Sequence, residues 1–286
     1  MRTVDKDTIT EAFMAYCAAS TEPRLKLVLS RLVDHLHRFA KEVDLTHEEW
    51  LQAIEFFYNA GKISSPQRNE FILLSDVLGL SSLVDMINSG GGTELSPLGP
   101  FYIEGAPLLE IGADLIQDNP GPHVAFHGVV TNADSGAPIQ GALLDVWQTA
   151  SNGLYSNQDP AQPDFNLRFK MLTDEHGGFA FTTVQPAPYS VPDDGPVGDL
   201  LRATGRHAWR PAHYHFLVSS PGERSLTTEI FVEDDPYLDQ DAVFGVRESL
   251  VVHPIRETDI DAVPFEMVAK DSLQLPFDRI TYEFRL

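Results

Sequence analysis

Two histidines separated by one residue, His213 and His215, are the side chains best placed to do chemistry in this sequence. The run around them is rich in Tyr, Phe, Leu and Val, which favours an extended chain. Because side chains alternate along a strand, both imidazoles are predicted to share one face, with Tyr214 and Phe216 on the other. Neutral imidazole is the commonest metal ligand, although an isolated pair of this kind is more often a solvent-facing feature. A metal site therefore requires further ligands.

Arg210 places a permanent positive charge close to the two histidines, with Pro211 interrupting the chain between them. A guanidinium repels a metal cation, so a metal site alone does not explain an arginine at this position. We expect Arg210 to face an anionic substrate bound beside the histidines.

Tyr155 and Tyr189 are the candidate further ligands. Each follows a predicted strand, Tyr155 in Gly153-Leu154-Tyr155-Ser156 and Tyr189 in a proline-rich loop. Taken singly, each is more often a packed aromatic residue. A phenol, with a pKa of about 10, binds a metal well only if the ion is charged enough to ionise it, as ferric iron is. Two tyrosinates and a hydroxide would neutralise Fe(III), and neutral imidazoles add no charge.

Composition limits the other classes of function. The chain has 286 residues, a formal net charge of −22 and one cysteine. The negative charge argues against nucleic acid or an anionic membrane as the main partner, and one cysteine excludes an intrachain disulfide. No run approaches the roughly 18 apolar residues of a membrane span, and the amino terminus lacks the apolar core of a secretion signal. We therefore expect a cytoplasmic protein.

Residues 1–92 are predicted to form a helical domain. Apolar residues recur at helical spacing after Pro23, and Thr46 begins a capping box. A second helix should therefore follow Thr46 and end near Gly61. Further helices are predicted from Pro66 to Val77 and over 84–87.

Residues 93–286 have a different texture, in which Pro and Gly separate short Val-, Ile-, Phe- and Leu-rich runs. This pattern is typical of an antiparallel β sandwich. The fold class predicted is α+β, an all-β sandwich preceded by an amino-terminal α-helical domain. The predicted strands are 123–131, 141–149, 167–173, 178–184, 212–219, 227–232 and 247–252.

Several of these segments together resemble the intradiol ring-cleaving dioxygenases, catechol-type branch. The resemblance covers nearly the whole chain and rests on motifs that are jointly specific. They are Leu98-Gly99-Pro100-Phe101-Tyr102, Pro138-Ile139-Gln140-Gly141-Ala142, Asp145-Val146-Trp147, Gly153-Leu154-Tyr155, Tyr189 and Arg210-Pro211-Ala212-His213-Tyr214-His215-Phe216.

The resemblance implies a sandwich catalytic domain that cleaves an aromatic diol with O2, and a homodimer formed through the helical domain, in some members with bound phospholipid. It implies one non-haem Fe(III) per chain. Its ligands would be Tyr155, Tyr189, His213 and His215. Tyr189 would leave the metal as the diol binds and act as a base, and Arg210 would stabilise negative charge on the ring.

The substrate implied is less sharply defined. By position in the family pattern the ring pocket is lined by Leu73, Asp76, Leu98, Gly99, Pro100, Phe101, Val191, Pro192 and Arg210. Asp76 interrupts an apolar helix; it is either a helix-end surface residue or an acceptor for an extra ring hydroxyl. The second reading resembles family members that cleave hydroxyquinol (benzene-1,2,4-triol) to maleylacetate or 3-hydroxy-cis,cis-muconate. Catechol and chlorocatechols are the alternatives.

Two other classes of function stay open. A zinc or ferrous site could be formed by His213, His215 and either Asp145 or Glu229. Many relatives carry Gln near Glu229, so this carboxylate is a departure from the family pattern and is not assigned to catalysis. A prealbumin-like sandwich binding module without catalysis is the third class, and it leaves Tyr155, Tyr189 and Arg210 without a role.

Overall fold

The computed structural model describes residues 3–65, 68–263 and 269–286. It divides into two compact units, residues 1–59 and 60–286, each with its own internal packing. This boundary falls within the predicted helical domain, and the division at residue 92 stays a prediction. Within the described ranges, no helix is both long and apolar enough to cross a membrane.

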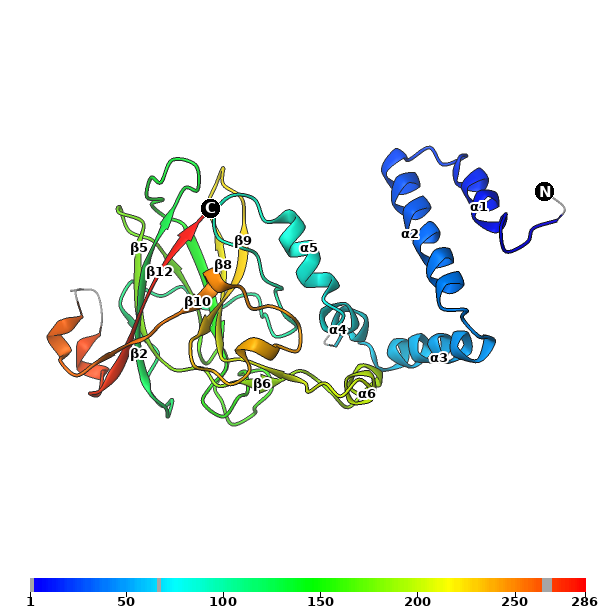
Figure 1. Cartoon of the computed structure of the whole chain (residues 1–286). Coiled ribbons are helices and arrows are strands. Elements are labelled where there is room, and N and C mark those ends of the chain that lie inside the picture. The colour runs from blue at the N-terminus through cyan, green and yellow to red at the C-terminus, as the bar shows by residue number, and fades with distance from the viewer. Residues whose placement is uncertain (1–2, 66–67, 264–268) are drawn as a thin grey trace. The chain divides into compact units, whose positions relative to one another are not determined.

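The first unit is helical. Its elements are α1 (Ile9–Cys17), α2 (Pro23–Glu42) and most of α3 (His47–Ile63) (Figure 1). α2 begins at Pro23 as predicted, since proline suits the first turn of a helix. The capping box of α3 is confirmed: the Thr46 hydroxyl accepts from the Glu49 amide at 3.2 Å, and the Glu49 carboxylate accepts from the Thr46 amide at 2.9 Å. α3 continues past Gly61 to Ile63.

Two shorter helices, α4 (Glu70–Val77) and α5 (Leu80–Asn88), follow in the second unit. α4 starts later than predicted because the Asn69 side chain accepts hydrogen bonds from the amides of Phe71 and Ile72 and so caps the helix there. Ser65 and Arg68 form an antiparallel bridge before it. Pro66, the predicted start, lies outside the described residues. Gly79, with φ of 74°, separates the two helices.

Two five-stranded sheets form the β sandwich (Figure 1). One contains, in spatial order, β1 (Ala113–Asp114), β5 (Gly178–Val184), β2 (His123–Thr131), β12 (Phe277–Arg285) and β11 (Ile255–Glu257). The other contains β10 (Val251–Val252), β9 (Leu226–Val232), β8 (His213–Ser219), β3 (Leu143–Gln148) and β4 (Arg168–Leu172). A separate pair consists of β6 (Tyr189–Ser190) and β7 (Trp209–Arg210), and α6 (Pro196–Ala203) lies between them in the chain.

The sheets are mixed, which corrects the prediction of a purely antiparallel sandwich. β12 runs parallel to β2, β1 parallel to β5, and β10 parallel to β9. The strand predicted at 247–252 is mostly a 3₁₀ turn, Glu248–Leu250, followed by the short β10. β12 was not predicted because its buried residues, Phe277, Ile280 and Phe284, do not alternate strictly with exposed ones.

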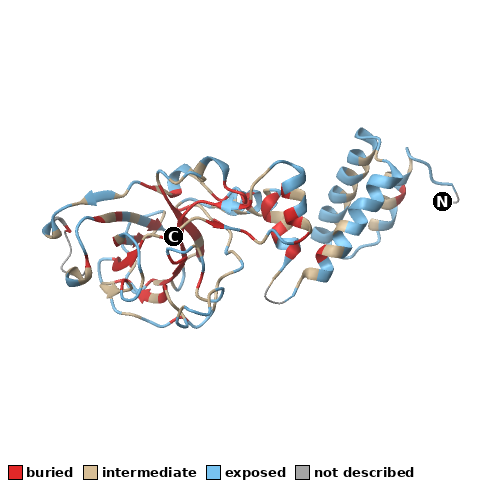
Figure 2. Ribbon diagram, turned by 90° about the horizontal axis from the view of Figure 1, so that it is seen from below, coloured by how far each residue is buried: buried red, intermediate tan, exposed pale blue. Residues whose placement is uncertain are grey.

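Aromatic side chains fill the space between the sheets. Phe126 and Phe181 stack with 5.2 Å between ring centroids, and Phe126 also contacts Tyr214 and Phe216 from the other sheet. Figure 2 shows the buried residues concentrated in the sandwich strands. This core fixes one face of β8 and leaves its other face available for a site.

Candidate metal centre

β8 carries His213 and His215 on the face opposite the core. Tyr214 and Phe216 are buried between the sheets, as alternation predicts. The two histidines are not solvent-facing: their exposed fractions are 2% and 1%. Their Nε2 atoms lie 3.0 Å apart. Two imidazoles thus face one buried point.

The strand register places His215 in a row of side chains across the sheet. Trp147 on β3 pairs with Arg168 on β4 and with His215 on β8, and His215 pairs with Glu229 on β9. Directly paired residues point to the same face of a sheet. The Trp147 and His215 rings stack with 4.7 Å between centroids and 6° between planes, which fixes the orientation of the imidazole.

Both tyrosines reach the histidines from other segments. The Tyr155 hydroxyl lies 2.9 Å from His215 Nε2. Tyr189 belongs to β6 and pairs with Arg210 on β7, so a short strand, rather than a free loop, positions it. Its ring centroid is 5.4 Å from that of Tyr155 and 5.6 Å from that of His213. The structure therefore brings together the four residues predicted to bind the metal.

The donor chemistry of these four residues suits a strongly charged cation. His213 Nδ1 lies 2.7 Å from the Pro211 carbonyl oxygen, which assigns the proton to Nδ1 and leaves Nε2 as an acceptor. Burial lowers the pKa of both His213 and His215, which favours the neutral imidazole that binds a metal. Burial raises the pKa of Tyr155 and Tyr189, and only a strong local positive charge can ionise such phenols. Ferric iron fits this set.

Arg210 is held by two buried carboxylates. Its Nη1 and Nη2 donate to the two Glu229 oxygens, each at 2.7 Å, and Nε and Nη2 donate to Asp241 at 3.0 and 3.2 Å. Nη1 also lies 3.4 Å from the Tyr189 hydroxyl. Burial acts to raise the pKa of Asp241, but Arg210 and the Gly245 amide together hold this pKa below its usual value. Arg210 was expected to face an anionic substrate, but two carboxylates of the protein, Glu229 and Asp241, are already its anionic partners.

Glu229 lies near the histidines but is already engaged. His213, His215 and Glu229 offer ligand atoms within 4.8 Å of one another, which matches the zinc or ferrous alternative in spacing. Both Glu229 oxygens, however, accept from Arg210, so a metal bound there would compete with a buried bidentate ion pair for the same carboxylate. Asp145, the other candidate, accepts from the Tyr102 hydroxyl at 2.9 Å and lies 3.5 Å from Lys170 Nζ.

The order of helical segment and β-rich domain is matched by known proteins. Residues 22–92 match the family model described as "Catechol dioxygenase N terminus", and residues 98–285 match that described as "Dioxygenase". The chain is 44% identical over 262 residues to the 6-chlorohydroxyquinol 1,2-dioxygenase of Cupriavidus pinatubonensis, covering 91% of this chain and 95% of that protein. This chain belongs to the intradiol ring-cleavage dioxygenases.

Two further relatives extend the comparison. The dioxygenase is 45% identical over 245 residues to the hydroxyquinol 1,2-dioxygenase of a Rhizobium species, with 84% of this chain and 83% of the relative covered. The solved structure of hydroxyquinol 1,2-dioxygenase from Pseudomonas putida matches with a TM-score of 0.89 and 44% identity, over 98% of this chain and 97% of that one. These matches confirm the predicted family and fold class and exclude a non-catalytic binding module.

The residues predicted to line the substrate pocket of the dioxygenase differ in burial, and some of them contact the candidate metal ligands. Phe101 stacks on Tyr155 with 4.8 Å between centroids. A methyl group added at Gly99 would lie 3.5 Å from His215 Cε1, so Gly99 approaches the histidines closely. Asp76 is buried on α4, which contradicts the surface reading of this residue. Of the others, Leu73 and Val191 are buried, Pro192 is half-buried, and Leu98 and Pro100 are exposed.

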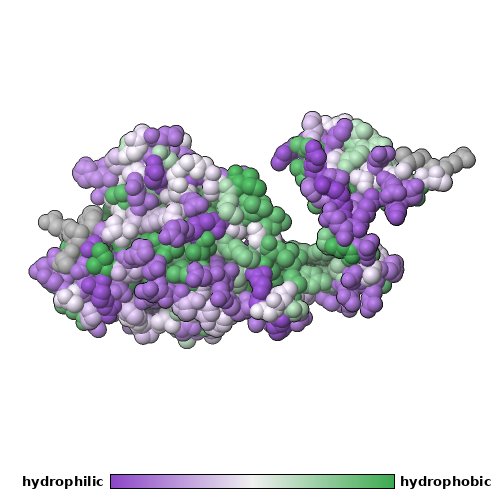
Figure 3. Space-filling model, in the orientation of Figure 1, coloured by the Kyte–Doolittle hydropathy of each residue, from purple (hydrophilic) through white to green (hydrophobic). Residues whose placement is uncertain are grey.

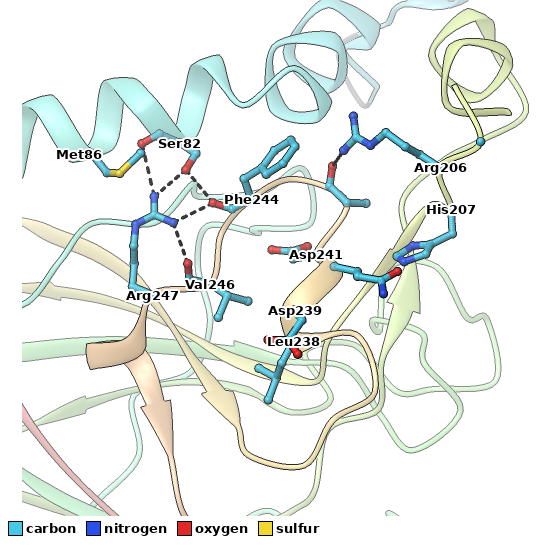
Figure 4. Close-up of a pocket in the computed structure, with 13 residues that line it drawn as sticks. Ser82, Met86, Arg206, His207, Leu238, Asp239, Asp241, Phe244, Val246 and Arg247 are labelled. Atoms are coloured by element: carbon cyan, nitrogen blue, oxygen red, sulfur yellow. Dashed lines mark hydrogen bonds between the residues drawn. The ribbon is translucent and has the colours of Figure 1, made fainter. Parts of the chain in front are cut away.

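A cavity of about 540 Å³ adjoins the Arg210 cluster and shares Asp241 with it (Figure 4). Arg247 donates to the Ser82 hydroxyl and to the Phe244 carbonyl oxygen, which ties α5 to the segment after Asp241. Arg206 donates to the carbonyl oxygens of Val77 and Ala242. These contacts position the turn that carries Asp241.

Gly245 closes this turn, and sequence analysis did not single it out. An added methyl group would lie 2.5 Å from Arg210 Nη2 and 2.9 Å from both Glu229 Oε2 and Asp241 Oδ2. We expect Gly245→Ala to lower the free energy of unfolding by about 1–3 kcal/mol and to reduce turnover, because the ion cluster must shift. Denaturant unfolding measures the first effect. Gly61→Ala is the control, because its methyl group meets only Phe71, at 3.9 Å; equal stability of the two variants would contradict the prediction.

Proposed function

We propose that this dioxygenase cleaves hydroxyquinol between its adjacent hydroxylated carbons, inserting both atoms of O2 and giving 3-hydroxy-cis,cis-muconate or its keto form, maleylacetate. The relatives named above act on hydroxyquinol or 6-chlorohydroxyquinol. The observation in this chain that carries the proposal is the buried carboxyl group of Asp76, for which plain catechol has no matching hydroxyl. Catechol and chlorocatechols are the alternative substrates.

For the cofactor we propose one non-haem Fe(III) per chain, held by Tyr155, Tyr189, His213 and His215. Convergence of two neutral imidazoles and two phenols on one buried point supports this set. Bound ferric iron supplies a Lewis acid that binds the ionised diol and makes its ring reactive toward O2. The engagement of both Glu229 oxygens by Arg210 disfavours the zinc or ferrous set.

Tyr189 and Arg210 have distinct parts in this proposal. A Tyr189 phenolate can accept a proton from a diol hydroxyl as the substrate binds. Arg210 Nη1, 3.4 Å from the Tyr189 hydroxyl, favours the phenolate before that transfer and negative charge on the substrate after it. Because two carboxylates hold the guanidinium, its charge is in place before the reaction and needs no reorganisation.

Asp76 is proposed to select the substrate. It is 8% exposed, and its Oδ1 has no hydrogen-bond partner among the described residues. Burial raises the pKa of Asp76 above its usual value. A buried carboxyl oxygen without a partner costs free energy that a third ring hydroxyl can recover. A substrate lacking this hydroxyl leaves the cost in place.

We therefore expect Asp76→Ala to lower the ratio of kcat/KM for hydroxyquinol to that for catechol by roughly 10- to 100-fold, which corresponds to about 1–3 kcal/mol for one buried polar group. Steady-state oxygen uptake with each diol gives the two constants. Asp85→Ala, on neighbouring α5, should leave the ratio unchanged. A ratio unaltered by Asp76→Ala would remove this residue from substrate selection.

The visible absorption spectrum of the purified protein tests the metal proposal directly. A tyrosinate bound to Fe(III) gives a red-brown charge-transfer band, and adding hydroxyquinol without oxygen should shift that band because the diol binds the metal. A fully metallated but colourless protein would refute the ferric tyrosinate site and favour the zinc or ferrous alternative.

We also propose a homodimer formed through the helical domain, residues 1–92, with residues 93–286 as the catalytic domain and a phospholipid bound between subunits. The family-model matches support this division, because they meet between residues 92 and 98. Apolar side chains gather over α5 (Figure 3), where Leu80, Leu83, Val84 and Ile87 are exposed. The expected cytoplasmic location stays a prediction.

A further inference from the structure

Arg168 is a second buried arginine near the candidate centre, and neither the proposed metal site nor the substrate pocket uses it. It lies on β4 and is 2% exposed. Its Nε donates to Ser156 Oγ at 2.9 Å and its Nη2 donates to Asn157 Oδ1 at 3.0 Å. Both partners directly follow Tyr155 in the chain. Arg168 therefore anchors the segment that carries this tyrosine.

The guanidinium of Arg168 also lies over the Tyr155 ring, with 5.5 Å from its central carbon to the ring centroid. This distance is within the range of a cation–π contact. Its third nitrogen, Nη1, is buried and has no hydrogen-bond partner in the part of the chain that the structure describes. In the same described part, Arg168 forms no ion pair with a carboxylate, whereas Arg210 is paired with Glu229 and Asp241.

A buried cation without an anionic partner is costly, so the surroundings of Arg168 require explanation. Two groups can supply negative charge near Arg168: the Asp145 carboxylate on β3, which is already bonded to Tyr102 and close to Lys170, and the Tyr155 phenol, whose ring lies under the guanidinium. Once Tyr155 is ionised, the cation over its ring has an anionic partner in a medium of low dielectric.

We propose that Arg168 is a positioning residue for the metal centre, which fixes the Tyr155 segment and stabilises the negative charge of the Tyr155 phenolate. The inference rests on the proposed function, in which Tyr155 binds iron as a phenolate. Arg168 then lies over the ring of Tyr155, while Arg210 lies beside the hydroxyl of Tyr189. Glu229 and Asp241 already balance the charge of Arg210. Arg168 has no such ion pair among the described residues, so a Tyr155 phenolate would balance its charge.

Arg168→Met in the iron-loaded protein tests the charge, and Arg168→Lys keeps the charge while losing the planar guanidinium. A cation over the ring stabilises the phenolate donor orbital more than the more distant iron orbitals. The charge-transfer band of Arg168→Met should therefore move to longer wavelength, with a smaller shift in Arg168→Lys. Arg279→Met, which removes a part-buried arginine from β12 in the other sheet, should leave the band in place.

The outcomes separate this inference from the proposed function. A colourless wild-type protein would refute the ferric tyrosinate centre, and with it this role. A coloured wild type with an unmoved band in folded, iron-loaded Arg168→Met would overturn the role of Arg168 alone. Equal shifts in the Met and Lys variants would overturn the proposed stabilisation of the Tyr155 phenolate by the charge of Arg168. Arg168 would then only hold the Tyr155 segment in place. If Arg168→Met does not fold, Ser156→Ala with Asn157→Ala must produce a shift of the same sign, and no shift would reject the proposal.

Discussion

Arg210→Met is expected to lower turnover per bound iron by at least about 100-fold, as removal of one preorganised charge-stabilising group does elsewhere. The variant should also lose stability. Glu229 and Asp241 are buried and would both lose their cation, and breaking a buried ion pair costs about 3–5 kcal/mol. Iron content should fall much less than turnover, because Arg210 donates no ligand. Oxygen uptake, metal analysis and denaturant unfolding measure the three quantities.

A combined variant separates the two effects. Arg210→Met with Glu229→Gln and Asp241→Asn removes all three charges, so it leaves no unpaired carboxylate and should recover much of the lost stability. Turnover should stay low, since the cation near Tyr189 is still missing. Recovery of turnover together with stability would show that Arg210 acts only through folding, and proportional losses of iron and turnover in Arg210→Met would argue for a role in metal retention.

The sequence was most informative where a functional residue lies in a local pattern. His213 and His215 follow from strand alternation, and Tyr155 and Tyr189 from their positions after strands. The partners of Arg210 have no such pattern: Glu229 and Asp241 are 19 and 31 residues away in the chain. No carboxylate lies close to Arg210 in the sequence, so the sequence predicts only an anionic substrate as its partner. The sequence signal for this pairing is Glu229 itself, a carboxylate within the predicted strand 227–232, because an acid buried in a sheet needs a cation.

The same distinction applies to the fold. β2 and β5 were predicted within their observed limits because dense β-branched and aromatic runs favour strands. β12 was missed, and so was its parallel pairing with β2, which joins segments about 150 residues apart. β6 and β7 contain two residues each, too few for any periodicity. Yet their pairing sets Tyr189 opposite Arg210, so part of the site depends on contacts that only the folded chain provides.

Tyr155→Phe is expected to lower iron affinity by more than about 100-fold, since loss of even an outer-shell partner of a ligand costs about 10- to 100-fold. One phenolate and one hydroxide would then face three positive charges in a buried site, which leaves one charge uncompensated. Tyr214→Phe is the matched control, because this buried tyrosine lies on the same strand as the histidines but faces the core. Metal analysis after dialysis against a chelator, with the visible spectrum, gives the affinity order.

Glu229→Gln completes the test, because it distinguishes the two possible ligand sets. If the ligands are two histidines and two tyrosines, an amide at position 229 can still accept from Arg210 and the iron should be retained. If His213, His215 and Glu229 bind the metal, the amide removes an anionic ligand, so Glu229→Gln should lose the metal and Tyr155→Phe should keep it. The two ligand sets therefore predict opposite orders of metal loss in these variants. The comparison is possible because Tyr155 reaches His215 from a loop, whereas Glu229 approaches it from β9.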